Sequence, residues 1–513
     1  MIFICCRIRR IPLRSAWSVA VWEKERLIFY FRRAEHVQSL SSGKASSLNG
    51  CQNDFGIVNL LAQSFIPMKV TWLMLMLSAV LCSFLASTAA FAQEDISDRS
   101  QQAVSKKSSQ DKKRKKRKPG FFYGNAGTGF RWNKGKSEVR LAGFMQADTR
   151  TYFDDAADSG KDNFLLRRIQ PSLEVKFNKT HSLYIMSSFA SAPGILDVFW
   201  EGNFAKPLNI RAGKFKPAFG LERLQSATAL AFNERAFPTS LAPNREIGGQ
   251  IFGTILWDTT EYQVGLFSGM VDNSSGLRDS VIYSNYSGVD FVARLFSHPL
   301  KHSDVELVKG LGLGIAYSYG TQQGNAQRGE SHLPVFISPG QQSIASYARG
   351  AFADGSRERI GPQLYYSYGP LGVLGEYTVS QQNVKLGAVT DKVTHNAFQA
   401  QLSWVLFNGD ASFRRIRPHS PLTLENISSL GAVQLVGRYA VLNLDDKAFA
   451  HGLFDSDHAV RKAQDFGIGI NWYLNRNIKF QLDYNQTHFT GGAGGGADRA
   501  EEKVLFSRMQ IAF

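Results

Sequence analysis

Cysteine is confined to the first part of the 513-residue chain. The main body of the sequence, residues 121–513, has none, so it cannot hold a disulfide scaffold, a thiolate zinc site or a cysteine nucleophile. The main body also lacks any apolar run of about 18 residues, so it offers no candidate transmembrane helix. The four cysteines of the chain are Cys5, Cys6, Cys51 and Cys82.

Motifs for catalysis and nucleotide binding are missing as well. The main body has neither a phosphate-binding loop nor a dinucleotide fingerprint. A serine–histidine pair on the wall of a barrel would leave no motif, so a barrel enzyme stays an alternative. We predict a protein that is not an enzyme and that has no cofactor and no metal site. The histidines lack the spacing of metal ligands, as at His395, His419, His451, His458 and His488.

The main body has only a small excess of positive over negative charge. The whole chain has a formal net charge of +16, which by itself would suggest a nucleic-acid or membrane partner. Residues 121–513 hold 39 basic and 35 acidic residues, so most of the positive excess lies upstream. A nucleic-acid partner is therefore not expected.

The positive excess belongs to segments that precede the main body. From Met68 the sequence has one lysine, an apolar run and an A-x-A pattern at residues 90–92. This is the layout of a cleavable signal peptide, so we assign residues 68–92 to one, with a membrane anchor as the alternative. We interpret residues 1–67 as an N-terminal extension assigned upstream of the true start, or else as an unusually long leader.

Residues 93–120 have the composition of a disordered linker. They contain the Lys/Arg run 112–118 and almost no apolar residue that could pack into a core. After export such a segment would meet anionic lipid or cell wall rather than nucleic acid.

Period-two alternation recurs throughout the main body in segments of about ten residues. Ile478, Phe480 and Leu482, for example, alternate with Lys479 and Gln481. Apolar side chains outside and polar ones inside are typical of a transmembrane barrel around water, with a soluble β-rich protein as the alternative. The sequence predicts an all-β fold, a transmembrane antiparallel β-barrel of about 16 strands. The strands are expected at residues 138–152, 164–177, 183–190, 195–203, 208–215, 247–258, 260–268, 287–297, 311–319, 358–368, 371–380, 394–406, 431–443, 464–474, 477–489 and 503–513.

The connections between these segments alternate in length, as short periplasmic turns and long external loops would. Two links on the short-turn side, 298–310 and 407–430, are longer than this rhythm predicts. The last strand ends on Phe513, and an aromatic terminal residue on an amphipathic strand is typical of outer-membrane barrels. Short turns are expected at 258–260, 369–370 and 475–476, and long links at 269–286, 320–357, 444–463 and 490–502.

The third long connection, residues 216–245, is the most informative one. It is too long for a turn and rich in alanine and aromatic residues, so we expect it to fold into the lumen and narrow the channel. A ring of arginine and lysine in a narrow, poorly screened space favours anions. Adjacent opposite charges, as at 222–223, leave structural ion pairs as an alternative role. The basic residues of the segment are Lys216, Arg223, Arg235 and Arg245.

Strand parity selects among the basic residues near this segment. Arg211 faces the lumen, whereas Lys214 and Lys216 have the opposite parity and must lie at the rim or beyond the strand end. Arg168 likewise points inward, and Arg167 points inward only if the strand is bulged or has ended there.

Several stretches of the main body resemble the phosphate-selective porin O and P family of Gram-negative outer membranes. The most specific are GKFKPAFGLE, from residue 213, and NERAFPTSLAPNR, from residue 233. Further stretches run in the family's order and extend the resemblance over nearly all of residues 130–513. They include FLLRRIQPSLEVKF, ILDVFWEGNF, LVKGLGLGIAYSYG, GAVQLVGRYAVLNLDD and GINWYLNRNIKFQLDYN.

The resemblance implies a sixteen-stranded barrel in the bacterial outer membrane, usually a homotrimer, with an arginine- and lysine-lined path for phosphate or polyphosphate. Its partners would be small anions and outer-membrane lipid. The residues implied for the anion-binding constriction are Arg167, Arg168, Asp197, Arg211, Lys214, Lys216, Arg223, Arg235 and Arg245.

Passive diffusion of small anions, phosphate among them, is the leading hypothesis for the function. A general porin with a weak anion bias is the second, because the net charge of the main body is small. A barrel enzyme or a surface attachment protein is the third.

Overall fold

The structure is a computed structural model. In the N-terminal unit, Met1–Ser87, strands β1 (Trp17–Glu23) and β2 (Arg26–Arg32) form an antiparallel pair. The expected signal peptide, the Lys/Arg run of the linker and the rest of the upstream extension lie outside the described residues. The residues that the structure describes are 17–23, 26–32, 119–124, 127–153, 160–190, 193–272 and 288–513.

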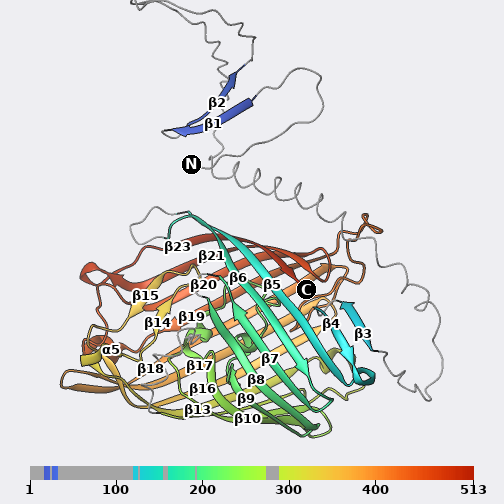
Figure 1. The fold of residues 1–513 in the computed structure, drawn as a ribbon. Helices are drawn as coiled ribbons and strands as arrows, with labels where there is room; N and C mark the ends of the chain where they lie inside the picture. The colour runs from blue at the N-terminus through green and yellow to red at the C-terminus, as the bar shows by residue number, and fades with distance from the viewer. Residues whose placement is uncertain are drawn as a thin grey trace, which may run out of the picture. The chain divides into compact units, whose positions relative to one another are not determined.

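Sixteen antiparallel strands form a closed barrel in the second unit, Thr88–Phe513 (Figure 1). The last strand of the ring pairs with the first, from Val504 opposite Tyr152 to Ala512 opposite Phe144. Closure leaves no free sheet edge in the ring, so the backbone polar groups of the strands can all be paired without water. The predicted barrel and its strand number are confirmed. The strands of the ring are β5 (Ser137–Tyr152), β6 (Asn163–Lys176), β7 (His181–Ser188), β8 (Gly194–Ala205), β9 (Leu208–Phe215), β10 (Glu246–Ile255), β11 (Thr260–Phe267), β12 (Asp290–Ser297), β13 (Gly312–Gln323), β16 (Phe352–Tyr368), β17 (Leu371–Leu386), β18 (Val389–Phe407), β19 (Ala432–Asn443), β20 (Val460–Tyr473), β21 (Ile478–Ala493) and β23 (Glu502–Ala512).

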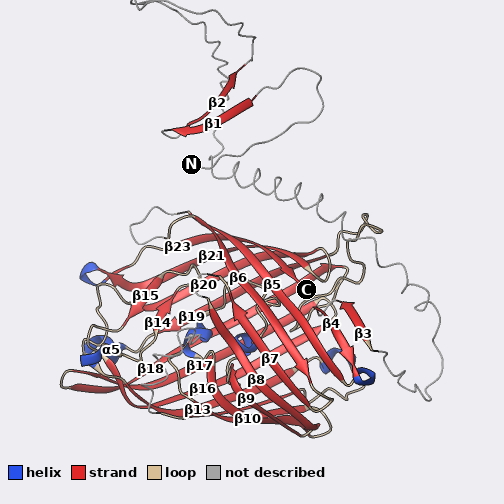
Figure 2. Cartoon of the chain, in the orientation of Figure 1, coloured by secondary structure: helices blue, strands red, loops and turns tan. Residues whose placement is uncertain are grey.

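Helices in the described part of the chain are short and lie between strands (Figure 2). None of them is long and apolar enough to cross a membrane. The helices are η2 (Asn133–Gly135), α2 (Leu221–Leu224), η3 (Phe237–Leu241), α4 (Glu306–Lys309), η5 (Ala326–Arg328), α5 (Asp446–Ala450) and η6 (Gly494–Gly496).

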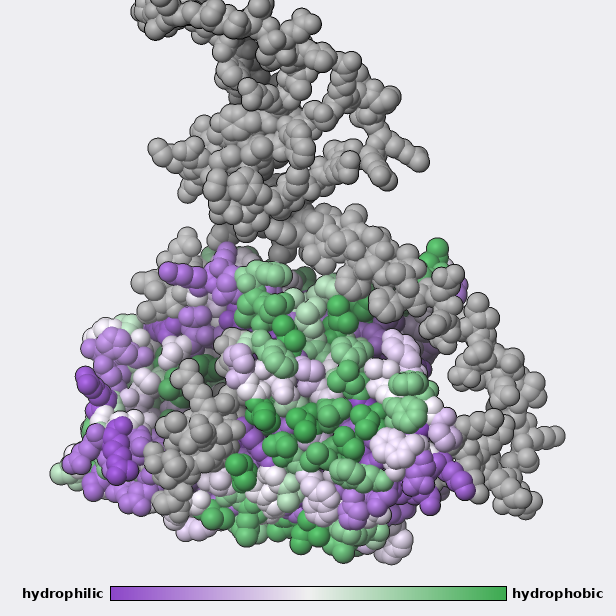
Figure 3. Space-filling model, viewed as in Figure 1, coloured by the Kyte–Doolittle hydropathy of each residue, from purple (hydrophilic) through white to green (hydrophobic). Residues whose placement is uncertain are grey.

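The two faces of the barrel wall differ in polarity. In β21 the polar side chains of Lys479, Gln481 and Asp483 are buried, whereas Leu482 between them is exposed. On the neighbouring strand β20, Ile468 is 67% exposed. Figure 3 shows apolar side chains gathered over the middle of the visible wall and polar ones toward its two ends. Apolar residues therefore point outward, as the alternation predicted for a barrel in lipid.

Connections at the two ends of the barrel differ in length. At the short-turn end, where β23 finishes, residues 206–207, 256–259, 369–370 and 474–477 make tight turns. The links 298–311 and 408–431 at this end are long, as the sequence indicated. The opposite, long-loop end differs from expectation in one place, because β17 and β18 extend to a turn of only residues 387 and 388. The long links at this end include 216–245, 268–289, 324–351 and 444–459.

A hairpin that the sequence analysis did not predict extends the sheet at the seam of the ring. Its strands β3 (Gly120–Gly124) and β4 (Gly127–Trp132) pair with each other, and β4 pairs with the first residues of β5. β23 pairs with β5 farther along, and Phe513 exchanges two backbone hydrogen bonds of 3.0 Å with Gly143. β4 and β23 thus occupy consecutive lengths of the same edge of β5.

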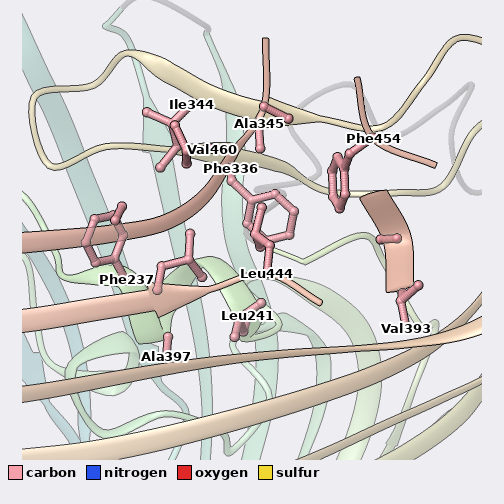
Figure 4. Close-up of a cluster of buried hydrophobic side chains, with 14 of the residues drawn as sticks. Phe237, Leu241, Phe336, Ile344, Ala345, Val393, Ala397, Leu444, Phe454 and Val460 are labelled. Carbon is pink, nitrogen blue, oxygen red and sulfur yellow. The ribbon is translucent and has the colours of Figure 1, made fainter. Parts of the chain in front are cut away.

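Apolar side chains from three long links pack together at the long-loop end (Figure 4). Phe237 and Leu241 come from η3, Phe336 comes from β14 (Val335–Ile337), and Phe454 comes from the link 444–459. We call this buried set the loop cluster. It includes Ile344 and Ala345 of β15 (Ser343–Ser346) and, from the wall, Val393, Ala397 and Val460.

Candidate functional site

Segment 216–245 is held by polar side chains on strands far from β9 and β10 in the ring. The carbonyl of Leu230 accepts hydrogen bonds from Lys479 Nζ at 2.9 Å and Gln481 Nε2 at 3.2 Å, both on β21. The carbonyl of Ala231 accepts one from Asn471 Nδ2 of β20 at 2.9 Å. Backbone groups of a non-helical segment need such partners once they are removed from water.

A buried carboxylate and a buried amide on the wall hold the other part of the segment. Glu376 of β17 accepts hydrogen bonds from the backbone N–H of Leu221 at 2.6 Å and of Glu222 at 3.4 Å. Gln399 Nε2 of β18 donates to Glu376 at 2.6 Å and to Glu222 at 3.1 Å. Helix α2 is therefore fixed to the wall at its first residues.

Two adjoining cavities lie between segment 216–245 and the wall of β5–β9. One has a volume of about 290 Å³ and reaches Ser338 in the link 324–351. The other has a volume of about 280 Å³ and reaches Phe144 and Tyr184 on the wall. Both are lined by Gln170 and by four basic residues, which we call the basic belt: Arg168, Lys216, Arg235 and Arg245.

A β-bulge turns both arginines of the Arg167–Arg168 pair toward this site. Gln146 on β5 pairs with Arg168, but the next residue, Ala147, pairs with Leu166, so Arg167 is the extra residue. Arg167 binds Glu234 through two hydrogen bonds of 2.6 and 3.0 Å. Arg168 donates to Gln146 Oε1 at 2.7 Å. The condition that the sequence set for an inward Arg167 is met.

Carboxylates on the strands bind two further predicted residues. Arg245, the last residue of the segment, makes a two-fold ion pair with Asp197 of β8, with both distances 3.1 Å. Arg211 binds Glu201 at 2.6 Å, and its guanidinium lies 4.5 Å from the ring centre of Phe199. Arg245 thus has the ion-pairing role that the sequence left open for the basic residues of segment 216–245.

Two basic-belt residues form no ion pair with a carboxylate in the described part of the chain. Within the described ranges, the hydrogen bonds of Lys216 and Arg235 go to backbone carbonyls: Lys216 donates to Arg223, and Arg235 donates to Glu222 and Gln225. Burial lowers the pKa of Lys216 well below its ordinary value, and the positive charges of Arg235 and Arg245 lower it further. An anion that entered the belt would relieve this mutual repulsion.

Comparison with known proteins identifies the family of the chain. The sequence matches the family described as phosphate-selective porin O and P over residues 139–513. The chain belongs to this family.

Individual relatives are distant. Porin O of Pseudomonas aeruginosa is 24% identical over 305 residues, which are 54% of this chain and 64% of that protein. The matched region thus spans less than two thirds of the relative's length. The outer membrane channel DcaP of Acinetobacter baumannii is 11% identical, with a TM-score of 0.49 over 76% of this chain and 100% of that one. The trimer form of OmpT from Vibrio cholerae is 8% identical, with a TM-score of 0.45 over 74% and 100%.

Family membership assigns the porin to the bacterial outer membrane and to channel proteins rather than enzymes. The part of the chain that the structure describes contains no group of three or more His, Cys, Asp or Glu residues placed to hold a metal ion.

Lys214 and Arg223 stand apart from the other predicted residues of the porin. Lys214 lines neither cavity, and its buried Nζ donates to the carbonyl of Ile195 at 3.0 Å. Arg223 lines the first cavity and donates to the carbonyl of Thr239 inside segment 216–245. Both are buried residues whose hydrogen bonds hold backbone in place.

Sequence reasoning missed the buried pair of Arg508 and Asp148, which lines neither cavity. Arg508 of β23 makes two hydrogen bonds of 2.7 and 2.6 Å with Asp148 of β5, and both side chains are fully buried. The partner of Arg508 depends on the pairing of β23 with β5, where Arg508 and Asp148 are directly opposite. Arg150 lies two residues farther along β5, and Glu234 contacts both arginines.

Proposed function

We propose that the porin conducts small anions, inorganic phosphate among them, by passive diffusion through the basic belt. The observation that carries this proposal is the shared boundary of the two cavities, where four of the five lining residues are basic. An anion passing from one cavity to the other would meet Arg168, Lys216, Arg235 and Arg245.

Part of the positive charge of the belt is neutralised by a carboxylate, which should weaken anion binding enough for the ion to leave. Arg245 is paired with Asp197, while Lys216 and Arg235 donate only to carbonyls in the described ranges. Conduction requires a site that attracts the ion yet releases it. The planar guanidinium groups also match the oxygens of phosphate, which favours oxyanions over halides.

Reversal potentials in planar bilayers test the proposal. The purified porin should prefer anions in a potassium chloride gradient, and phosphate should compete with the chloride current. Arg235→Ala removes one belt charge and should lower the phosphate competition about tenfold or more, because two unit charges about 4 Å apart attract each other by about 1 kcal/mol in water and about 4 kcal/mol at an effective dielectric constant of about 20. Lys206→Ala, which removes an exposed lysine bound to Asp258 at the short-turn end, serves as the control.

A cation preference of the unaltered porin would refute the proposal. Anion preference without phosphate competition, unchanged in Arg235→Ala, would instead identify a general porin with a weak anion bias. Absence of any conductance would favour a surface attachment role.

We also propose that the porin assembles as a homotrimer, which the family resemblance implies. Unheated gel electrophoresis and native mass spectrometry of the detergent-extracted protein should give a particle of three chains. A particle of one chain would refute this.

A further inference from the structure

Glu234 lies at the meeting point of four arginines. Arg167 of β6 binds its carboxylate with an Nε–Oε1 distance of 2.6 Å. The guanidinium nitrogens of Arg150 and Arg168 lie 3.8 Å from its oxygens, and that of Arg508 lies 3.7 Å away. These arginines come from β5, β6 and β23, whereas the carboxylate comes from segment 216–245. The strands thus build an anion site, and the segment inserts a carboxylate into it.

A carboxylate does not fill this site completely. Its two oxygens form hydrogen bonds with Arg167, while the other three guanidiniums stay beyond hydrogen-bond distance at 3.7–3.8 Å. The buried Nε of Arg150 has no hydrogen-bond partner among the described residues. A tetrahedral oxyanion has four oxygens and would offer acceptors that the carboxylate lacks.

The site also has positive charge to spare. Asp148 is the second carboxylate of the group, and Arg508 binds both of its oxygens. Four guanidiniums thus face two carboxylates. The arginines hold the pKa of Glu234 far below its ordinary value, although burial alone would raise it. Glu234 therefore carries a full negative charge at neutral pH.

The site borders a cavity that lies on the proposed conduction path. Glu234, Arg167 and Arg168 all line the cavity of about 290 Å³, and Arg168 belongs to the basic belt as well. An ion in that cavity would therefore stand next to the carboxylate and its guanidiniums.

We propose that Glu234 is a tethered competitor of the permeating ion: a tetrahedral oxyanion such as hydrogen phosphate displaces its carboxylate from the four arginines and leaves when the carboxylate returns. Glu234 thereby sets how long the oxyanion stays. This inference rests on the proposed function for its biological meaning, but the site itself makes a binding prediction that does not require conduction.

Titration calorimetry with inorganic phosphate on the full-length porin in detergent tests the site directly. Glu234→Gln should bind phosphate at least about tenfold more tightly than the unaltered porin, which is the size of effect expected for hydrogen bonds to charged groups. The same variant should show a longer phosphate block of chloride current in bilayers. An unchanged phosphate affinity would overturn the inference.

Asp465→Asn is the matched control. Asp465 is also buried inside the barrel and pairs with one arginine, Arg438, at 3.2 Å, but it lines neither cavity. This variant removes the same charge without emptying a site of four guanidiniums, so its phosphate affinity should stay close to that of the unaltered porin. An equal rise in both variants would show a general field effect and would overturn the inference.

Glu234→Asp distinguishes the effect of the carboxylate's position among the arginines from the effect of its negative charge. The shorter side chain keeps the negative charge but withdraws the carboxylate from the guanidiniums. Its phosphate affinity should lie between those of the unaltered porin and Glu234→Gln. An affinity equal to that of the unaltered porin would show that charge, and not occupancy of the site, sets the affinity, and would overturn the inference.

Folding of Glu234→Gln provides a second readout. Without the carboxylate the four arginines repel one another, so the variant should refold better in phosphate than in chloride of equal ionic strength, and the unaltered porin should not discriminate. Absence of phosphate rescue in a variant that fails to fold would overturn the inference. Cation preference of the unaltered porin together with tight phosphate binding by Glu234→Gln would instead refute only the proposed function.

Discussion

Lys216 is the residue of the basic belt whose charge can change within an accessible pH range. Its ammonium group loses a proton as the pH rises through its pKa, and burial together with the nearby arginines lowers that pKa. The belt therefore loses one positive charge at a pH below the range in which ordinary lysines titrate. The arginines of the belt keep their charge under the same conditions.

We predict that the anion preference of the porin, as measured by reversal potentials from acidic to alkaline pH, declines as the pH rises through the lowered pKa of Lys216. Lys216→Arg keeps the charge, so its preference should stay constant over the same pH range. Saturating phosphate should move the decline to higher pH, because a bound anion stabilises the ammonium form. A decline of equal size in Lys216→Arg would show that another group titrates.

At the scale of elements, the loop cluster joins links that are far apart in the sequence. Phe336 in β14 is fully buried against residues of η3 and of the link 444–459 (Figure 4). The cluster thus attaches the link 324–351 to segment 216–245, which carries three basic-belt residues. Packing in the cluster and the geometry of the belt are therefore connected through segment 216–245.

We predict that Phe336→Ala loosens the link 324–351 without unfolding the barrel. Removal of a buried phenyl ring costs about 3–5 kcal/mol of packing free energy, and here the loss falls on the loops rather than on the strand pairs. Limited proteolysis should cut the link faster, and single-channel currents should become noisier. Val335→Ala, at a neighbouring position with 51% exposure, should change neither. Loss of the heat-dependent gel shift of the folded barrel would contradict the prediction.

For the whole molecule, the outward apolar face of the wall determines which surface of the barrel can contact lipid. Ile468 lies in the middle part of β20 and is 67% exposed. In a membrane, this exposed surface faces lipid rather than water.

We predict that Ile468→Arg destabilises the folded barrel in lipid vesicles by about 2–4 kcal/mol, the cost of a charged side chain on the lipid face near the midplane. Urea unfolding followed by tryptophan fluorescence measures the change. Ile427→Arg is the control, because Ile427 is 77% exposed in the link 408–431 at the short-turn end. Similar losses in both variants would argue against a lipid contact at Ile468.

Much of the architecture could be predicted because a lipid environment imposes strict rules on sequence. An outward face must be apolar and every strand must pair, so alternation, strand number and the lengths of most connections are visible in the amino-acid order. The hairpin β3–β4 was missed because its strands are short and lie outside the ring. The loop cluster was missed because its contacts join links between different strands.

The family could be recognised in the amino-acid order from its specific stretches, and the barrel and the inward direction of Arg168 and Arg211 from local alternation. The contacts of the site came only with the folded chain. A bulge in β6 directs Arg167 inward, the pairing of β23 with β5 places Arg508 opposite Asp148, and segment 216–245 brings Glu234 to these arginines. Such contacts depend on how distant strands are aligned across the closed ring, and alternation within one strand carries no information about that alignment.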